Sequence, residues 1–155
     1  MQGADCEAGS CVGFPLPPGP DEVVFTELLI IPATSESDEW FELTLSPNSP
    51  ADVVDIAGCV VTSDLGESWT VPSDSGGAGL LWQGAPIVLA RSADGPDLAG
   101  SIDLVYENAL TLDNVADTLT LRCSDMVIDH VWWDVTTGWS VPVGSTRSLG
   151  GNLVS

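Results

Sequence analysis

Short runs in which apolar and polar residues alternate, each ended by glycine or proline, are the feature that most limits how this chain can fold. Its 155 residues include 11 prolines and 16 glycines, which interrupt the chain too often for helices of ordinary length. Successive side chains of an extended strand point to opposite faces, so alternation gathers the apolar residues on one face. The pattern therefore predicts an all-β protein.

The clearest example is the segment 40–45 (WFELTL), in which Phe41, Leu43 and Leu45 share one face. Further strands are expected at residues 23–31, 53–62, 68–71, 87–90, 102–106, 118–123 and 126–133. Ser124 and Asp125 have the composition of a hairpin turn between the last two. Short strands at spacings near ten residues are typical of an immunoglobulin-like β-sandwich, in which two sheets pack face to face.

Residues 1–20 differ from the rest of the chain. A small polar loop between Cys6 and Cys11 is followed by the proline-rich run FPLPPGP, which favours an extended, polyproline-like segment. We predict a leader or linker over residues 1–20 and one sandwich domain over residues 21–155, which is long enough to bury a core. The leader either links to an upstream domain or lies against the sandwich through Phe14 and Leu16.

The charge of the chain limits the kinds of partner that it can bind. It has 23 acidic residues and only three basic ones, Arg91, Arg122 and Arg147, and its formal net charge is −20. Such a surface repels phosphate backbones, so we expect no nucleic-acid binding. It favours cations, basic partners or solubility in salt. No apolar run of about 18 residues is present, so no membrane insertion is expected, and an exported form would have had its signal removed.

The four cysteines, an even number at wide spacing, indicate two disulfides. Three pairings are open, and we favour Cys6–Cys11 with Cys59–Cys123, because period two places the latter two on the apolar sides of their strands. Structural disulfides predict a periplasmic, cell-surface or extracellular location. The alternative is four buried thiols in a cytosolic protein.

Catalytic motifs are absent from the sequence. It contains no Gly-x-Ser-x-Gly, no His-Glu-x-x-His and no phosphate-binding glycine loop. His130 follows Asp129, but neighbouring strand residues point to opposite faces and do not form a base with its orienting carboxylate. We therefore predict that the protein is not an enzyme. A hydrolase that uses two of the many carboxylates is a third, less favoured reading.

Acidic loops supply the candidate metal ligands. Glu36, Asp38 and Glu39 crowd one loop, and Asp94 and Asp97 crowd another. Oxygen ligands on loops suit calcium, although no Asp-x-Asp-x-Asp-Gly loop is present. The alternative is an ordinary solvated acidic loop, with no cofactor at all.

Six tryptophans are many for a chain of this length, and they provide candidate stacking surfaces for a sugar or a protein partner. They are Trp40, Trp69, Trp82, Trp132, Trp133 and Trp139. Trp132 and Trp133 are adjacent in an expected strand, so one should face the core and the other the solvent. Burial in the core is the alternative for the set as a whole.

Three blocks of sequence resemble the lamin tail domain, a sandwich found at the C-terminal end of nuclear lamins and in many bacterial exported proteins. The first block is VFTELLIIP at 24–32 with DEWFEL at 38–43. The second is DIAGCVV at 55–61, WTVP at 69–72 and GAPIVL at 84–89. The third is LTLDN at 110–114, DTLTL at 117–121, VIDHV at 127–131 and GSTR at 144–147. The resemblance covers residues 21–149. Family members often carry an asparagine soon after the Glu-Leu pair, where this chain has Thr44 and Leu45.

This resemblance implies a non-catalytic module that serves adhesion, anchoring or protein–protein interaction outside the cytoplasm. The expected partner is a protein or a surface glycan. The alternative function is a calcium-assisted carbohydrate-binding module attached to an exported enzyme.

Overall fold

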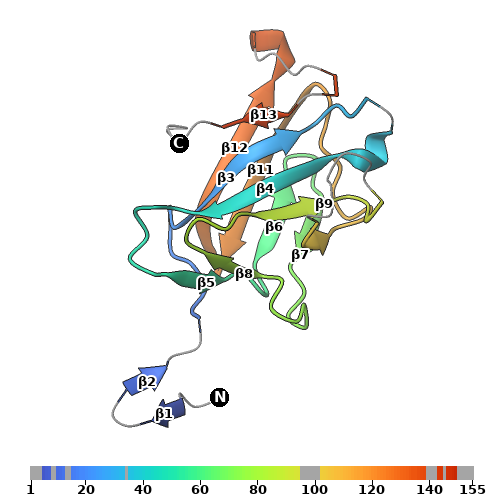
Figure 1. The fold of residues 1–155 in the computed structure, drawn as a ribbon. Coiled ribbons are helices and arrows are strands. Elements are labelled where there is room, and N and C mark those ends of the chain that lie inside the picture. Colours follow the sequence, from blue (N-terminus) through green and yellow to red (C-terminus); the bar gives the residue numbers. More distant parts are fainter. Residues whose placement is uncertain are drawn as a thin grey trace.

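The computed structural model describes residues 5–7, 10–12, 15–33, 35–94, 102–138, 143–144 and 146–149, with the backbone alone at 5–7, 10–12 and 147. Two sheets lie one over the other (Figure 1). This arrangement confirms the predicted all-β sandwich and is compatible with the immunoglobulin-like type. The helices in the described part of the chain are single turns, η1 (Glu36–Asp38) and η2 (Val135–Thr137), and none is long and apolar enough to cross a membrane.

The first sheet has five strands in the order β10-β9-β4-β3-β13. They are β10 (Leu104–Val105), β9 (Ile87–Ala90), β4 (Trp40–Leu45), β3 (Val23–Leu29) and β13 (Arg147–Ser148). Strand β10 runs parallel to β9, and the other described pairs of this sheet are antiparallel. Strands β3 and β4 form its long centre.

The second sheet has four antiparallel strands in the order β12-β11-β6-β7. They are β12 (Met126–Asp134), β11 (Ala116–Cys123), β6 (Val60–Ser63) and β7 (Ser68–Thr70). Two small pairs complete the described strands: β5 (Val53–Asp55) with β8 (Leu80–Trp82), and β1 (Asp5–Glu7) with β2 (Ser10–Val12).

The core lies between the two main sheets and follows the predicted alternation. Phe41 and Leu43 on one sheet and Leu119 and Leu121 on the other are all fully buried. The Phe41 ring lies 5.6 Å from the ring of Tyr106, measured between centroids. Burying such side chains is the main favourable contribution to folding.

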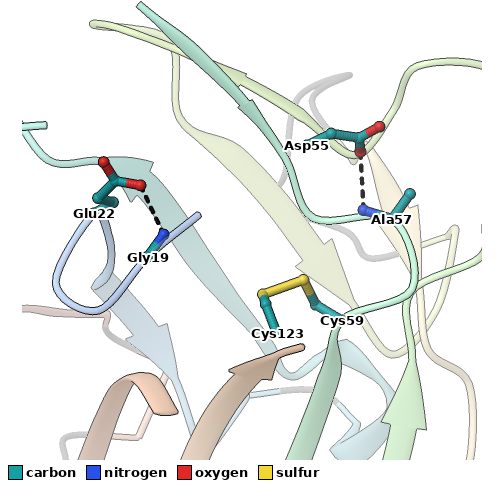
Figure 2. Close-up of a disulfide and its surroundings, with 6 residues drawn as sticks. All are labelled: Gly19, Glu22, Asp55, Ala57, Cys59 and Cys123. Carbon is teal, nitrogen blue, oxygen red and sulfur yellow. Dashed lines mark hydrogen bonds between the residues drawn. A yellow bond between two sulfur atoms is a disulfide. The ribbon is translucent and has the colours of Figure 1, made fainter. Parts of the chain in front are cut away.

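The Cys59–Cys123 disulfide is confirmed and ties the start of β6 to the end of β11 (Figure 2). It is the chemistry of an oxidising compartment. The register of β1 with β2 places Cys6 opposite Cys11, but the two side chains lie outside the described part of the structure. The Cys6–Cys11 bridge therefore stays a prediction.

The expected strand region over 53–62 is divided into two strands, because the chain turns between Asp55 and Val60. Asp55 Oδ1 accepts a hydrogen bond from the Ala57 backbone N–H at 2.9 Å (Figure 2). Gly58 then adopts a φ of +79°, a left-handed conformation that glycine adopts without steric cost. As a result β5 pairs with β8, while β6 joins the four-stranded sheet.

Two further expectations have different outcomes. The hairpin turn is confirmed, since Ser124 and Asp125 both have positive φ, as a two-residue turn of this kind requires. The leader does reach the sandwich, but not through the Leu16 side chain, which is 75% exposed. The Leu16 carbonyl instead accepts a hydrogen bond from the Asp55 N–H at 3.0 Å. Phe14 lies outside the described residues.

One carboxylate joins the edges of the two sheets. Asp129 on β12 accepts a hydrogen bond through Oδ2 from the Phe25 backbone N–H on β3 at 2.8 Å. A second backbone N–H, that of His130, also bonds to it, and burial raises the pKa of Asp129. Each strand has a register shift close to this contact. Asp129 thus provides an acceptor where β3 and β12 do not pair through their backbones.

We predict that Asp129→Ala lowers the free energy of unfolding by about 1–3 kcal/mol, because the Phe25 N–H loses its acceptor at the seam between the sheets. Urea unfolding followed by tryptophan fluorescence measures this loss. Asp129→Asn, which keeps an acceptor oxygen, should lose less. Equal losses in the two variants would mean that the contact with Phe25 does not matter.

Candidate functional site

The two outward faces of the sandwich differ in what covers them. On the five-stranded sheet, outward side chains of β3, β4 and β9 form a second buried cluster, composed of Leu29, Trp40, Val88 and Ala90, against which Ile102 packs. Trp40 is only 7% exposed. The apolar side chains of this face are therefore shielded from solvent where β3 ends and β4 begins.

The outward face of the four-stranded sheet is open to solvent. Its side chains alternate with buried residues along each strand, and none of them is itself buried. We call this surface the open face; it consists of Val60, Thr62, Ser68, Thr70, Thr118, Thr120, Arg122, Val127, His130 and Trp132.

Hydroxyl groups fill the middle of the open face, and larger side chains stand along its β12 side. Trp132 is paired across the strands with Thr118, and His130 with Thr120. Trp132 is 52% exposed and Val127 39% exposed. An exposed aromatic ring and an exposed aliphatic group beside adaptable hydroxyls are features of protein-binding surfaces.

The adjacent tryptophans divide as predicted. Trp133 points into the core, is 1% exposed, and donates its indole N–H to the Asp113 carbonyl at 2.7 Å. Trp132 points outward. Of the other tryptophans, Trp82 is 53% exposed on β8, away from the open face, and Trp139 lies outside the described residues.

A hollow of about 280 Å³ opens where β11 begins and β12 ends, next to Trp132. It is lined by Asp64, Ala116, Asp117, Thr118, Trp132, Trp133 and Asp134. Aromatic and carboxylate groups therefore meet at one corner of the open face.

Two carboxylates of the hollow, those of Asp117 and Asp134, differ in burial and in hydrogen bonding. Asp117 is buried, and burial raises its pKa. It accepts hydrogen bonds from the Ser63 hydroxyl and the Asp64 N–H, each at 3.0 Å, so it fixes the turn after β6. Asp134 lies nearer the solvent, and hydrogen bonds from Thr136 lower its pKa, which keeps it ionised.

A second hollow, of about 340 Å³, lies beside the disulfide. The leader residues Pro15 and Pro17 form one wall, and Asp55, Gly58 and Ser124 are among the residues opposite. This hollow marks where the leader passes over the sandwich.

The three carboxylates of the predicted calcium loop, Glu36, Asp38 and Glu39, differ in their surroundings. Glu36 and Asp38 lie in the exposed turn η1, whereas Glu39 is buried, 1% exposed, and bonded to Arg91 at 3.1 Å. The described residues contain no group of three side chains placed to hold a metal ion, and Asp97 lies outside them. Calcium binding by Glu36, Asp38 and Glu39 stays a prediction.

Glu39 and Arg91 form a buried polar centre at the start of β4. The Glu39 carboxylate also accepts the Leu112 N–H at 3.1 Å, and its backbone carbonyl accepts the Tyr106 hydroxyl at 3.2 Å. Burial raises the pKa of Glu39 to about 7, against the lowering effects of Leu112 and Arg91. Because these groups bond to one another, we infer that the centre is structural. It joins the segments of the chain that carry Glu39, Arg91, Tyr106 and Leu112.

His130 and Asp129 do not form a catalytic pair. The His130 side chain lies on the open face, whereas the Asp129 carboxylate is turned to the seam with β3 and bonds to Phe25. This agrees with the expectation from strand geometry.

The roles of Asp117 and Asp129 could not be predicted from the sequence, because an acidic residue in a strand looks the same whether it faces water or a backbone N–H. For the Glu39–Arg91 pair one signal was present: Arg91 is one of only three basic residues and follows an apolar strand directly.

Comparison with known proteins gave no relative. No family model matches the chain, and neither a curated protein nor a solved structure matches it. The resemblance to lamin tail domains therefore stays a prediction from the sequence blocks.

Stability should fall as the pH rises from about 5 to 8. Folding raises the pKa of Glu39 from 4.5 to about 7, so the folded state binds the proton more tightly than the unfolded chain does. Unfolding within this interval releases a proton, and its free energy falls with rising pH by about 3 kcal/mol from this group.

Urea unfolding at pH 5, 6, 7 and 8 tests this prediction with Glu39→Gln as the comparison. The variant cannot ionise at this position, so its stability should depend less steeply on pH than that of the natural chain. Repulsion among the surface carboxylates is common to both proteins. Parallel profiles would show that Glu39 does not titrate in this range.

Proposed function

We propose that this chain is a non-catalytic binding module, similar to lamin tail domains, that works outside the cytoplasm in adhesion, anchoring or protein–protein interaction. We further propose that it binds its partner through the open face. The observation that carries the proposal is the contrast between the two outward faces: apolar side chains are covered on the five-stranded sheet and exposed on the four-stranded one.

The exposure of β12 supports a binding role. Of the eight large hydrophobic side chains that are exposed in the described residues, Met126, Val127 and Trp132 belong to this one strand. Leaving them in water forgoes the favourable free energy of burial. A partner that covers the strand would recover it, and aromatic groups such as Trp132 are frequent binding hot spots.

The location outside the cytoplasm is supported by the Cys59–Cys123 disulfide, which persists in oxidising compartments. A net charge of −20 supports a partner that carries basic groups and opposes one with a phosphate backbone.

A protein partner is favoured over a glycan by the composition of the open face. Trp132 is the one aromatic ring among its ten residues apart from the His130 imidazole, whereas a flat sugar-binding platform usually stacks several rings. The calcium-assisted carbohydrate module has no specific support in the described residues.

We predict that Trp132→Ala weakens binding of the purified, fluorescently labelled chain to the surface of its source cells by about tenfold or more, as expected for a hot-spot residue. Flow cytometry over a concentration series gives the apparent Kd. Trp82→Ala is the matched control, because Trp82 is equally exposed, at 53% against 52%, but stands on β8.

Treating the cells with protease before the titration should remove the binding sites, whereas a glycosidase should leave them. The proposal fails if binding is not saturable, or if both tryptophan variants bind as the natural chain does. Loss after glycosidase alone would replace the protein partner by a glycan.

A further inference from the structure

We propose that the hollow beside Trp132 receives a basic side chain, arginine or lysine, from the partner protein. This inference rests on the proposed function, because it names the chemistry by which the open face would recognise its partner. Three independent features support it: the size of the hollow, its aromatic wall and its carboxylates.

The hollow is small for a ligand pocket, and a single side chain of a partner could occupy it. Its volume is about 280 Å³, below the range of about 300–1,000 Å³ that is usual for ligand pockets. It also opens at the corner of a sheet, where a partner lying on the open face could reach it with a single side chain.

Trp132 supplies the aromatic wall. It lines the hollow and is 52% exposed, so part of the indole is accessible from the side of the open face. The negative potential over an indole ring attracts a guanidinium or ammonium group that lies against it. Its neighbour directly opposite on β11 is the small residue Thr118.

Asp134 and Asp64 supply the negative charge. Asp134 Oδ1 accepts the Thr136 N–H at 2.8 Å and the Thr136 hydroxyl at 2.6 Å, which orients the carboxylate. The Thr137 backbone N–H also bonds to this carboxylate, and each carboxylate oxygen can accept more than one hydrogen bond. The Asp64 backbone is fixed by Asp117 at 3.0 Å, while its side chain is exposed.

The chain's own cations are placed elsewhere. Arg91 is paired with Glu39, Arg122 lies opposite Val127 near the other end of β12, and Arg147 belongs to β13 in the other sheet. Within the described residues the ion pair formed is Arg91–Glu39, so a cation from outside the chain could pair with Asp134 and Asp64. The overall charge of −20 would also attract a basic segment as it approaches.

Calorimetric titration tests the proposal with one probe, the peptide acetyl-Gly-Arg-Arg-Gly-amide, and its analogue in which neutral citrulline replaces each arginine. At 150 mM salt the arginine peptide should bind at least about tenfold more tightly. Asp134→Asn and Asp64→Asn should each weaken it by about five- to tenfold, and Trp132→Ala by a similar factor.

Asp74→Asn is the matched control, because it removes the same charge from an exposed loop between β7 and β8. It should change the affinity less than about twofold, since charges beyond a Debye length are screened. Circular dichroism of each variant verifies the fold, and the shift of the Trp132 indole N–H in an NMR titration locates the peptide.

Equal effects of Asp74→Asn and Asp134→Asn would overturn the proposal, because they would show diffuse attraction to an acidic surface. Equal affinity for the citrulline peptide would overturn it as well. Either result, together with Trp132-dependent binding to cells, would leave the proposed function standing. Selective arginine binding without any Trp132-dependent binding to cells would support the hollow and refute the proposed function.

Discussion

The layer of apolar side chains between the two sheets is the constraint on which the rest of this structure depends. Phe41 and Leu43 reach it from one sheet, and Leu119 and Leu121 from the other, all without exposure to solvent. Many of the strands are only two to four residues long, and strands this short do not hold together by backbone hydrogen bonds alone. Their stability must come from the burial of one face.

Carboxylate side chains accept hydrogen bonds from backbone N–H groups that the short strands leave unpaired. Asp55, Asp103, Asp129 and Glu67 accept backbone N–H groups of Ala57, Val88, Phe25 and Thr111, respectively. Part of the acidic excess therefore belongs to the fold rather than to the surface. An aspartate at a turn or seam can satisfy a backbone donor that no strand reaches.

The fold class and the core could be predicted from the sequence because alternation is a local signal. The strand β4, the turn at Ser124 and the Cys59–Cys123 bridge all follow from period two and from turn chemistry. The break between β5 and β6 could not be predicted in the same way. It depends on which sheet each half joins, and the apolar residues Val53, Val54, Val60 and Val61 look continuous in the sequence.

The candidate site was predictable only in part. Adjacency indicated that one of Trp132 and Trp133 would face outward, but not which outward face would remain uncovered. That depends on the cluster around Trp40, which assembles from β3, β4 and β9. The pairing of Glu39 with Arg91 is equally non-local, because Glu39 precedes β4 and Arg91 follows β9, and the two meet only in the folded chain.

Amide hydrogen exchange in the native state tests most directly whether the apolar layer holds both sheets as one unit. The account predicts that the slowest amides of β4, between Phe41 and Leu43, and of β11, between Leu119 and Leu121, exchange with the same free energy, equal to that of global unfolding. Exchange of β4 at a clearly lower free energy than β11 would contradict it, because the sheets would then open independently.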